Sequence, residues 1–329
     1  MIAAGETRPR QGPGPGSLLL VALCLWLFKD ALFLGGVFYK RDIHLVWHPQ
    51  VEGFVRAVAA ASWPTWDGSP AFGQPLLADP SAMALYPLTW LNLLVRPWVY
   101  YTVFAVLHLL LTAFGMRALA RGLGFGPEAA IACALLWALS GPYLSLVDLW
   151  HHYAGASWMP WVVLAALRAL AGGRREVVVF GLALAAQVLA GSADMCAMTL
   201  LVAAALGAVR VLEWRQPLSP ANRTALARGL GGVLLAMGLS AALWVTALEV
   251  VSRAARADLP QSVRTYWSLH PAVLLEAFLP RLFDSLPLLP EVRAALFESR
   301  EPFFTFLYLG VATLPLVGAG LAAPHPLRR

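Results

Sequence analysis

A polar stretch at residues 40–87 carries the carboxylate, imidazole and indole side chains best suited to chemistry in a largely apolar chain. It holds Asp42, His44 and His48 near its start and Asp79 near its end. Carboxylates and imidazoles exchange protons with bound reactants, which is the basis of general acid–base catalysis. Polar segments beside membrane spans usually serve chemistry or recognition. We therefore expect the functional site to include this stretch.

Asp42 is the first candidate for catalysis. It lies just beyond the first apolar run, where a carboxylate can reach both membrane-bound and aqueous reactants. A general base needs only proximity to the proton and a suitable pKa. The plainer interpretation is a solvated acid that pairs with Lys40 or Arg41, and the sequence leaves both interpretations open.

An irregular run at residues 63–75 contains Trp66 and Gln74 among several prolines and glycines. Aromatic side chains in such a loop either anchor at the membrane interface or stack on a sugar ring, and both alternatives stand. Asp79 precedes Pro80, a pattern that is typical of the start of a turn. We count Trp66, Gln74 and Asp79 as candidate substrate-binding residues.

A histidine pair, His151 and His152, lies in a very short loop between two apolar runs. We expect these imidazoles to form hydrogen bonds to a phosphate group. A divalent metal site that combines them with Asp42 and His44 is chemically feasible but is not favoured, because nothing in the sequence brings the four residues together. The cofactor requirement is thus left open.

A cationic and aromatic cluster near residue 265 includes Arg264 and Tyr266. The planar guanidinium of arginine binds phosphate through two parallel hydrogen bonds. Arginines next to a membrane also contact the headgroups of ordinary anionic lipids, which is the more common explanation. We include Arg264 and Tyr266 among the candidate substrate-binding residues.

The composition determines the class of protein that must position these residues. Hydrophobic residues make up 59% and charged residues 13% of the chain, with a mean hydropathy of +0.67, whereas soluble domains carry about 25% charged residues. Scattered basic residues argue against nucleic acid as a partner. The three cysteines lie in apolar runs without CxxC spacing, which argues against a disulfide framework or a zinc site.

A helix needs about 20 apolar residues to cross the hydrocarbon core, so the sequence predicts an all-α polytopic membrane protein with about eight spans. The expected spans lie near residues 17–38, 97–116, 128–147, 154–171, 176–191, 195–212, 229–250 and 303–321.

The positive-inside rule predicts the orientation, because arginines gather on one side of these spans. That side, with both chain ends, is expected to be cytoplasmic, and it carries Arg8, Arg10, Arg117, Arg121, Arg174, Arg175, Arg210, Arg215, Arg223, Arg228, Arg328 and Arg329.

The expected domain organisation is simple. Residues 1–16 form a disordered cytoplasmic tail, and residues 17–322 form one transmembrane domain with long outer loops at 39–96 and 252–302. Each loop contains an amphipathic piece after a proline, either Pro49 or Pro271, and we expect both pieces to be helices in the lipid headgroup layer. Residues 323–329 form a cytoplasmic end.

The motifs of the first outer loop occur in a definite order. They are Arg41-Asp42, Trp63-Pro64-x-Trp66, Phe72-Gly73-Gln74-Pro75-Leu76-Leu77-Ala78-Asp79-Pro80 and Leu85-Tyr86-Pro87, followed later by Leu139-Ser140-Gly141, Trp158-Met159-Pro160-Trp161, Ala190-Gly191 and Leu307-Tyr308-Leu309-Gly310. This order resembles bacterial YfhO-type membrane proteins, which are similar to the GT-C class of multi-spanning glycosyltransferases. The resemblance covers almost the whole chain, and the Gly-Gln-Pro block is its most specific part.

The resemblance implies transfer of a sugar from a polyprenyl-phosphate donor to an envelope glycan or lipid acceptor, at the outer face of the bacterial inner membrane. It also implies that Asp42 is the general base, while membrane lipids surround the fold. Family members usually have more than eight spans, so the resemblance further implies a fragment or a truncated product after the eighth. A lipid or solute transporter, or a truncated non-catalytic membrane scaffold, is the alternative function.

Overall fold

The computed structural model describes residues 14–40, 42–70, 72–211, 216, 219–254, 260, 263, 268–297, 304 and 306–322. Helices dominate these residues, and the one sheet among them is a two-residue antiparallel pair of β1 (Trp66–Asp67) with β2 (Gln74–Pro75). The prediction of an all-α fold is therefore confirmed for the described part of the chain.

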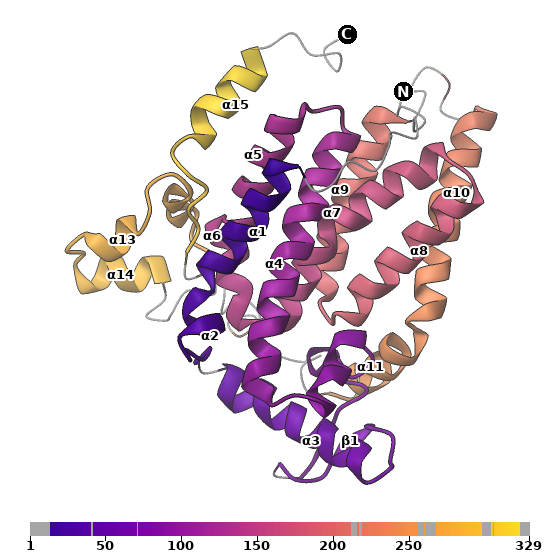
Figure 1. Cartoon of the computed structure of the whole chain (residues 1–329), viewed down its shortest axis with the longest axis vertical. Coiled ribbons are helices and arrows are strands. Elements are labelled where there is room, and N and C mark those ends of the chain that lie inside the picture. The colour runs from indigo at the N-terminus through magenta and orange to yellow at the C-terminus, as the bar shows by residue number, and fades with distance from the viewer. Residues whose placement is uncertain are drawn as a thin grey trace.

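A bundle of long helices forms the body of the molecule (Figure 1). Its members are α4 (Pro97–Gly122), α5 (Pro127–Ala138), α7 (Trp150–Ala171), α8 (Arg174–Leu189), α9 (Ala193–Arg210) and α10 (Pro220–Leu239). Helix α7 is central, since it packs against α4, α8, α9 and α10. Five consecutive α7 residues, 162–166, are all buried, as expected for a helix that is apolar on every side.

Three helical segments of the described residues are long and apolar enough to cross a membrane. They are α4, the run Pro127–Asp148 that joins α5 to α6 (Gly141–Ser145) and a short 3-10 turn, and α7. Helix α10 and α11 (Ala241–Arg253) make a fourth if they count as one span, although their axes differ by 74°. The described residues thus contain three or four such segments, and the predicted count of about eight is not confirmed.

Two of the predicted spans are interrupted helices. The first ends early, because α1 (Pro15–Leu27) gives way to a short α2 (Lys29–Phe33) at the exposed Lys29–Asp30 pair, and Gly35 then takes a left-handed conformation. The span expected at 229–250 is split at Ser240, where α10 ends and α11 turns away. Polar side chains and a left-handed glycine end helices in this way.

The last predicted span is shorter than expected. Helix α15 covers only Thr313–Ala322, and the chain before it, at residues 306–310, is irregular. Gly310 has a left-handed φ of 100°, and a carbonyl of the second outer segment accepts a hydrogen bond from the amide of Leu309. The residues just before α15 are thus held by that segment and do not extend the helix.

One end of the bundle is covered by residues 40–96, which we call the capping segment (Figure 1). In chain order it contains a π-helical turn (Ile43–Trp47), α3 (His48–Ala59), β1, β2, a 3-10 turn (Pro80–Ala82) and a 3-10 helix (Pro87–Leu93). Prolines at residues 64, 70, 75 and 80 keep its central part from forming a helix. The predicted loop is therefore a folded element.

Helix α3 is the amphipathic helix predicted after Pro49, but its location corrects the prediction of an interfacial helix. Val51 and Phe54 are 3% and 2% exposed, and the Phe54 ring meets the Trp90 ring edge to face at 5.2 Å between centroids. The apolar face is covered by the protein itself, because aromatic residues of the capping segment and α4 offer a closer-packed partner than lipid.

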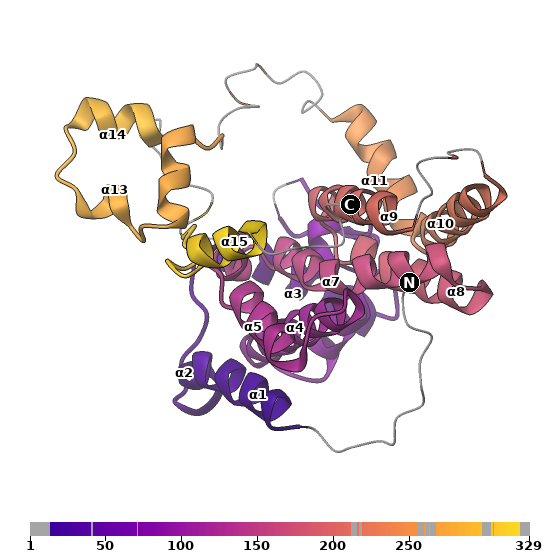
Figure 2. The same ribbon diagram turned by 90° about the horizontal axis from the view of Figure 1, so that it is seen from above.

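The second outer segment is built differently. Its described elements are a 3-10 helix (Pro271–Ala277), α13 (Leu282–Ser285) and α14 (Pro290–Phe297), which project to one side of the bundle in Figure 2. Their core is small and contains Val273, Phe283 and Leu307. The amphipathic α-helix expected after Pro271 is thus a 3-10 helix, with three residues per turn.

Candidate functional site

Asp42 lies at the capped end, immediately before the π-helical turn. The turn is fixed by Trp47, whose ring stacks on Tyr100 and meets Tyr101 edge to face at 4.7 Å. The Tyr101 hydroxyl in turn donates to the carbonyl of Val147 at 2.7 Å. The start of the capping segment is therefore tied to the ends of two bundle helices.

An ion pair joins Lys40, two residues before Asp42 in the chain, to the bundle. Lys40 Nζ lies 2.8 Å from a carboxylate oxygen of Asp148, two residues before the start of α7. Lys40 was one of the two partners that the plainer interpretation offered to Asp42; the other, Arg41, lies outside the described residues. In the structure the amine of Lys40 pairs with Asp148, so a cation and two carboxylates gather at this end of the bundle.

Asp79 holds the middle of the capping segment together. Its carboxylate accepts hydrogen bonds from Gln50 Nε2 at 2.9 Å and from the amide and hydroxyl of Ser81 at 2.9 and 2.8 Å. It therefore starts the Pro80–Ala82 turn, which agrees with its interpretation as a turn residue. Through Gln50 the same carboxylate ties this turn to α3.

The Asp79 turn docks on the bundle. Trp150, the first residue of α7, donates its indole N–H to the carbonyl of Ser81 at 2.6 Å. The carbonyl of Pro80 packs against Gly191 in the turn between α8 and α9, where a Cβ atom would overlap it and φ is +84°. A glycine is required at this position for both reasons.

The histidine pair lies at this docking point. His152 Nδ1 is 2.9 Å from Ser192 Oγ and 3.2 Å from a carboxylate oxygen of Asp194. The Ser192 hydroxyl donates to Asp194 at 2.7 Å, so its oxygen accepts from His152, which places the proton of the neutral ring on Nδ1. The rings of His151 and His152 have centroids 4.1 Å apart.

His151 contains an unusual polar atom. Its Nδ1 is buried and has no hydrogen-bond partner in the described part of the structure, while its ring also contacts the indole of Trp150. A buried polar nitrogen without a partner is costly. This nitrogen can accept a hydrogen bond from a group that binds beside it, or donate one to that group.

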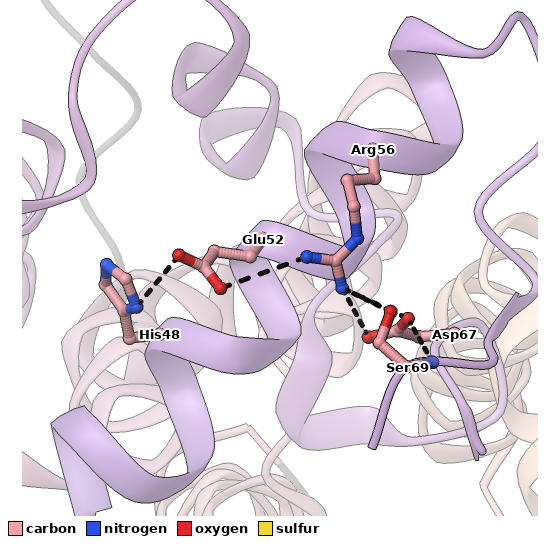
Figure 3. Close-up of polar contacts among 5 residues, drawn as sticks. All are labelled: His48, Glu52, Arg56, Asp67 and Ser69. Carbon is pink, nitrogen blue, oxygen red and sulfur yellow. Dashed lines mark hydrogen bonds and ion pairs between the residues drawn. The ribbon is translucent and has the colours of Figure 1, made fainter.

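A chain of charges crosses the surface of the capping segment (Figure 3). Arg56 lies 3.2 Å from both carboxylate oxygens of Asp67 and 2.9 Å from Ser69 Oγ. Glu52 lies between His48, at 3.6 Å, and Arg56, at 3.9 Å. The chain ties the hairpin of β1 and β2 to α3.

The Asp67 carboxylate is stabilised in its charged form. Burial by itself raises its pKa, but hydrogen bonds from the amide and hydroxyl of Ser69 and the nearby Arg56 guanidinium outweigh it, so the pKa lies below the ordinary value of 3.8. Asp67 is 6% exposed and lies against the backbone of Gly53. The carboxylate thus fixes the hairpin and is not available to a reactant.

The other predicted site residues are distributed unevenly. Trp66 and Gln74 lie on the hairpin, on β1 and β2, while Arg264 and Tyr266 lie outside the described residues. Across the parts of the chain that the structure describes, no group of three or more His, Cys, Asp or Glu side chains is arranged to hold a metal ion. The structure brings together Asp79, the histidine pair and the turn after α8.

Sequence reasoning missed several residues that build this site. Gln50, Trp150 and Ser192 make its connecting hydrogen bonds, and their partners lie 29 to 69 residues away in the sequence. One signal was present: Glu52 and Arg56 are four residues apart, the spacing of neighbours on a helix face.

Comparisons with models of protein families, with curated proteins and with solved structures of other proteins find no match for this chain.

Proposed function

We propose that this chain is a membrane glycosyltransferase, similar to YfhO-type proteins and the GT-C class, that transfers a sugar from a polyprenyl-phosphate donor to an envelope glycan or lipid. The observation that carries the proposal is the folded capping segment, in which Asp42 follows Lys40 by two residues and the Lys40–Asp148 ion pair joins the start of the segment to the bundle. The order of motifs in that segment supports the same conclusion.

The proposed reaction uses Asp42 as general base. Its carboxylate takes the proton of the acceptor hydroxyl, and the hydroxyl oxygen then forms a bond to the anomeric carbon of the donor sugar. The bond between that carbon and the phosphate oxygen breaks, and its electron pair leaves with the polyprenyl phosphate. Nearby cations and N–H groups stabilise the negative charge that develops there.

The histidine pair and Lys40 are the proposed phosphate ligands. The Nδ1 atom of His151 is a buried polar atom without a partner among the described residues, which supports a site for a polar group of the donor. His152 is oriented by Ser192 and Asp194, and Lys40 supplies a positive charge at the same end. Arg264 and Tyr266 remain proposed ligands outside the described residues.

The proposed setting is the bacterial inner membrane. About eight apolar segments cross it, both chain ends are cytoplasmic, and the capping segment faces the outside. The arginine distribution supports this orientation, and the three or four long apolar segments support a membrane location. The lipid tail of the donor then lies among membrane lipids with its phosphate at the capped end.

The test is a transfer assay with the full chain in proteoliposomes that contain a polyprenyl-phosphate hexose, with envelope extract as acceptor. Asp42→Asn keeps the size of the side chain but removes its proton-accepting capacity, so transfer should fall by roughly 100-fold or more. Glu52→Gln, which changes an exposed carboxylate of α3, should leave transfer within about twofold. Full activity of Asp42→Asn would contradict the proposal.

A transporter is the second candidate, because the 74° bend between α10 and α11 is of the kind found in the discontinuous helices of transporters. The two functions differ in one measurement. A transporter would move a labelled polyprenyl-phosphate sugar across sealed vesicles in the absence of acceptor, and Asp42→Asn would not abolish that movement.

A further inference from the structure

The hairpin at residues 63–75 exposes aromatic side chains on the surface of the capping segment. Trp63 and Trp66 are each 56% exposed, and Phe72 is fully exposed. Clusters of exposed apolar side chains with a polar rim usually mark a binding surface. We call Trp63, Trp66 and Phe72 the aromatic face.

Trp66 is held in a fixed position. In β1, Asp67 points inward to α3 and Trp66 points outward, as alternation along a strand requires. The indole of Trp66 covers Gly73, where a Cβ atom would overlap the ring and φ is +88°. One face of the ring therefore rests on backbone, while much of the side chain stays accessible to solvent.

The aromatic face is braced from below. The Trp63 ring packs on Trp90 with 5.8 Å between centroids, and Trp90 packs on the buried Phe54 of α3. The Arg56–Asp67 ion pair ties the hairpin to the same helix (Figure 3). Rings fixed in this way lose little side-chain entropy when a ligand binds, which favours affinity.

The position and surroundings of the aromatic face favour a water-exposed ligand over lipid. In Figure 1 the hairpin lies beyond α3 at the far end of the molecule, away from the middle of the bundle. A polar side chain lies beside the rings, because Gln74, which is partly exposed, follows the glycine that the Trp66 indole covers. Sugars combine a C–H face, which stacks on an indole ring, with hydroxyl groups that pair with such side chains.

We infer that the aromatic face is a carbohydrate-binding platform that holds a neutral oligosaccharide, with Trp66 as its central stacking residue. This inference rests on the proposed function for its role, which is to retain the acceptor glycan near the transfer site. Binding itself requires neither the donor nor Asp42. Failure of binding and failure of transfer are thus separate results.

The experiment measures binding of three soluble probes, maltohexaose, cellohexaose and mannohexaose, to the full chain in nanodiscs by saturation-transfer NMR and calorimetry. We expect wild type to bind at least one probe and Trp66→Ala to bind it roughly tenfold more weakly. Trp98→Ala, which removes an indole of similar exposure on α4, and Asp42→Asn should bind as wild type does.

Three results would overturn the inference. The first is absence of binding by wild type to all three probes, and the second is unchanged affinity of Trp66→Ala. The third concerns lipid: a nitroxide at Phe72→Cys, with the three native cysteines replaced by alanine, should be accessible to a water-soluble nickel reagent. Protection from nickel together with high accessibility to oxygen would place the face in the membrane.

Discussion

The two outer segments begin alike in sequence and end differently in structure. In each, a proline precedes apolar residues at helical spacing. After Pro49 this pattern forms α3 and buries Phe54 in an aromatic core, whereas after Pro271 it forms a 3-10 helix that leaves Leu274 56% exposed. The partner surface decides the outcome. Phe54 packs on Trp90 and Val51 joins the aromatic cluster at the end of α4, whereas the described part of the second segment packs in a small core of its own.

The largest effect should come from removing the side chain that distinguishes the two segments. Phe54→Ala leaves a cavity under Trp90 and should cost about 3–5 kcal/mol of local stability. Leu274→Ala, in the second segment, should stay within about 0.5 kcal/mol because the side chain is exposed. Hydrogen exchange of the two segments measures both, and equal effects would remove the distinction.

Two left-handed glycines make a second matched pair. Gly191→Ala forces φ strain and an overlap with the Pro80 carbonyl, so it should destabilise docking of the capping segment by about 2 kcal/mol or more. Gly310→Ala would meet Thr313 Oγ1 at an ordinary contact distance of 3.8 Å and should cost only the strain of its φ of 100°, about 1 kcal/mol. Thermal unfolding in detergent should rank them in this order; the reverse order would mean that Gly191 makes no close contact.

A third pair compares two tyrosine hydroxyls. The Tyr86 hydroxyl donates to His108 Nε2 at 2.8 Å and accepts from the Trp158 indole at 3.0 Å, since His108 Nδ1 donates to the carbonyl of Phe104. Tyr86→Phe leaves the buried His108 and the part-buried Trp158 without this hydrogen-bond partner and should cost about 1–3 kcal/mol.

The control for Tyr86 is Tyr308, near the second segment. Among the described residues its hydroxyl accepts a hydrogen bond from one exposed amide, that of Val311, so Tyr308→Phe should change stability by less than about 0.5 kcal/mol. Chemical unfolding in detergent distinguishes the two variants. A small effect of Tyr86→Phe would show that water replaces the lost hydroxyl.

The smallest effect is a pH dependence confined to the capping segment. Because the folded pKa of Asp67 lies below 3.8, its ion pair stabilises the hairpin fully above that pH and loses this contribution as pH falls through the folded pKa. Arg56→Gln should weaken the hairpin by about 0.5–1 kcal/mol at pH 7. The variant should also lose less of its hairpin stability as the pH falls. Hydrogen exchange of residues 63–75, corrected for the chemical rate at each pH, measures both. If the variant lost as much hairpin stability at low pH as wild type does, Asp67 would be excluded as the cause of that loss.

Local features of the capping segment could be predicted from the sequence, but its packing could not. Helical spacing located α3, and the Asp-Pro pair located the turn at Asp79. The sequence did not show which surface covers Phe54, because the spacing of an amphipathic helix is the same whether lipid or protein covers its apolar face.

The candidate site shows the same limit. Residue types identified Asp42 and the histidine pair, but the partners of His152, at Ser192 and Asp194, depend on how α7 packs against α9. Lys40 is a further example, since this near neighbour of Asp42 in the sequence pairs with Asp148, which lies far along the chain. Contacts between residues this far apart in the sequence are set by tertiary packing.

The most direct test asks on which side of the membrane the capping segment lies, because both proposals require it to face outward. Single cysteines replace Gly68 on the hairpin and Arg175 at the start of α8, both exposed, in a chain without its native cysteines. An impermeant maleimide applied to intact cells should label Gly68→Cys, whereas Arg175→Cys should react only after the membrane is opened. Labelling of Arg175→Cys in intact cells, with Gly68→Cys protected, would contradict the account.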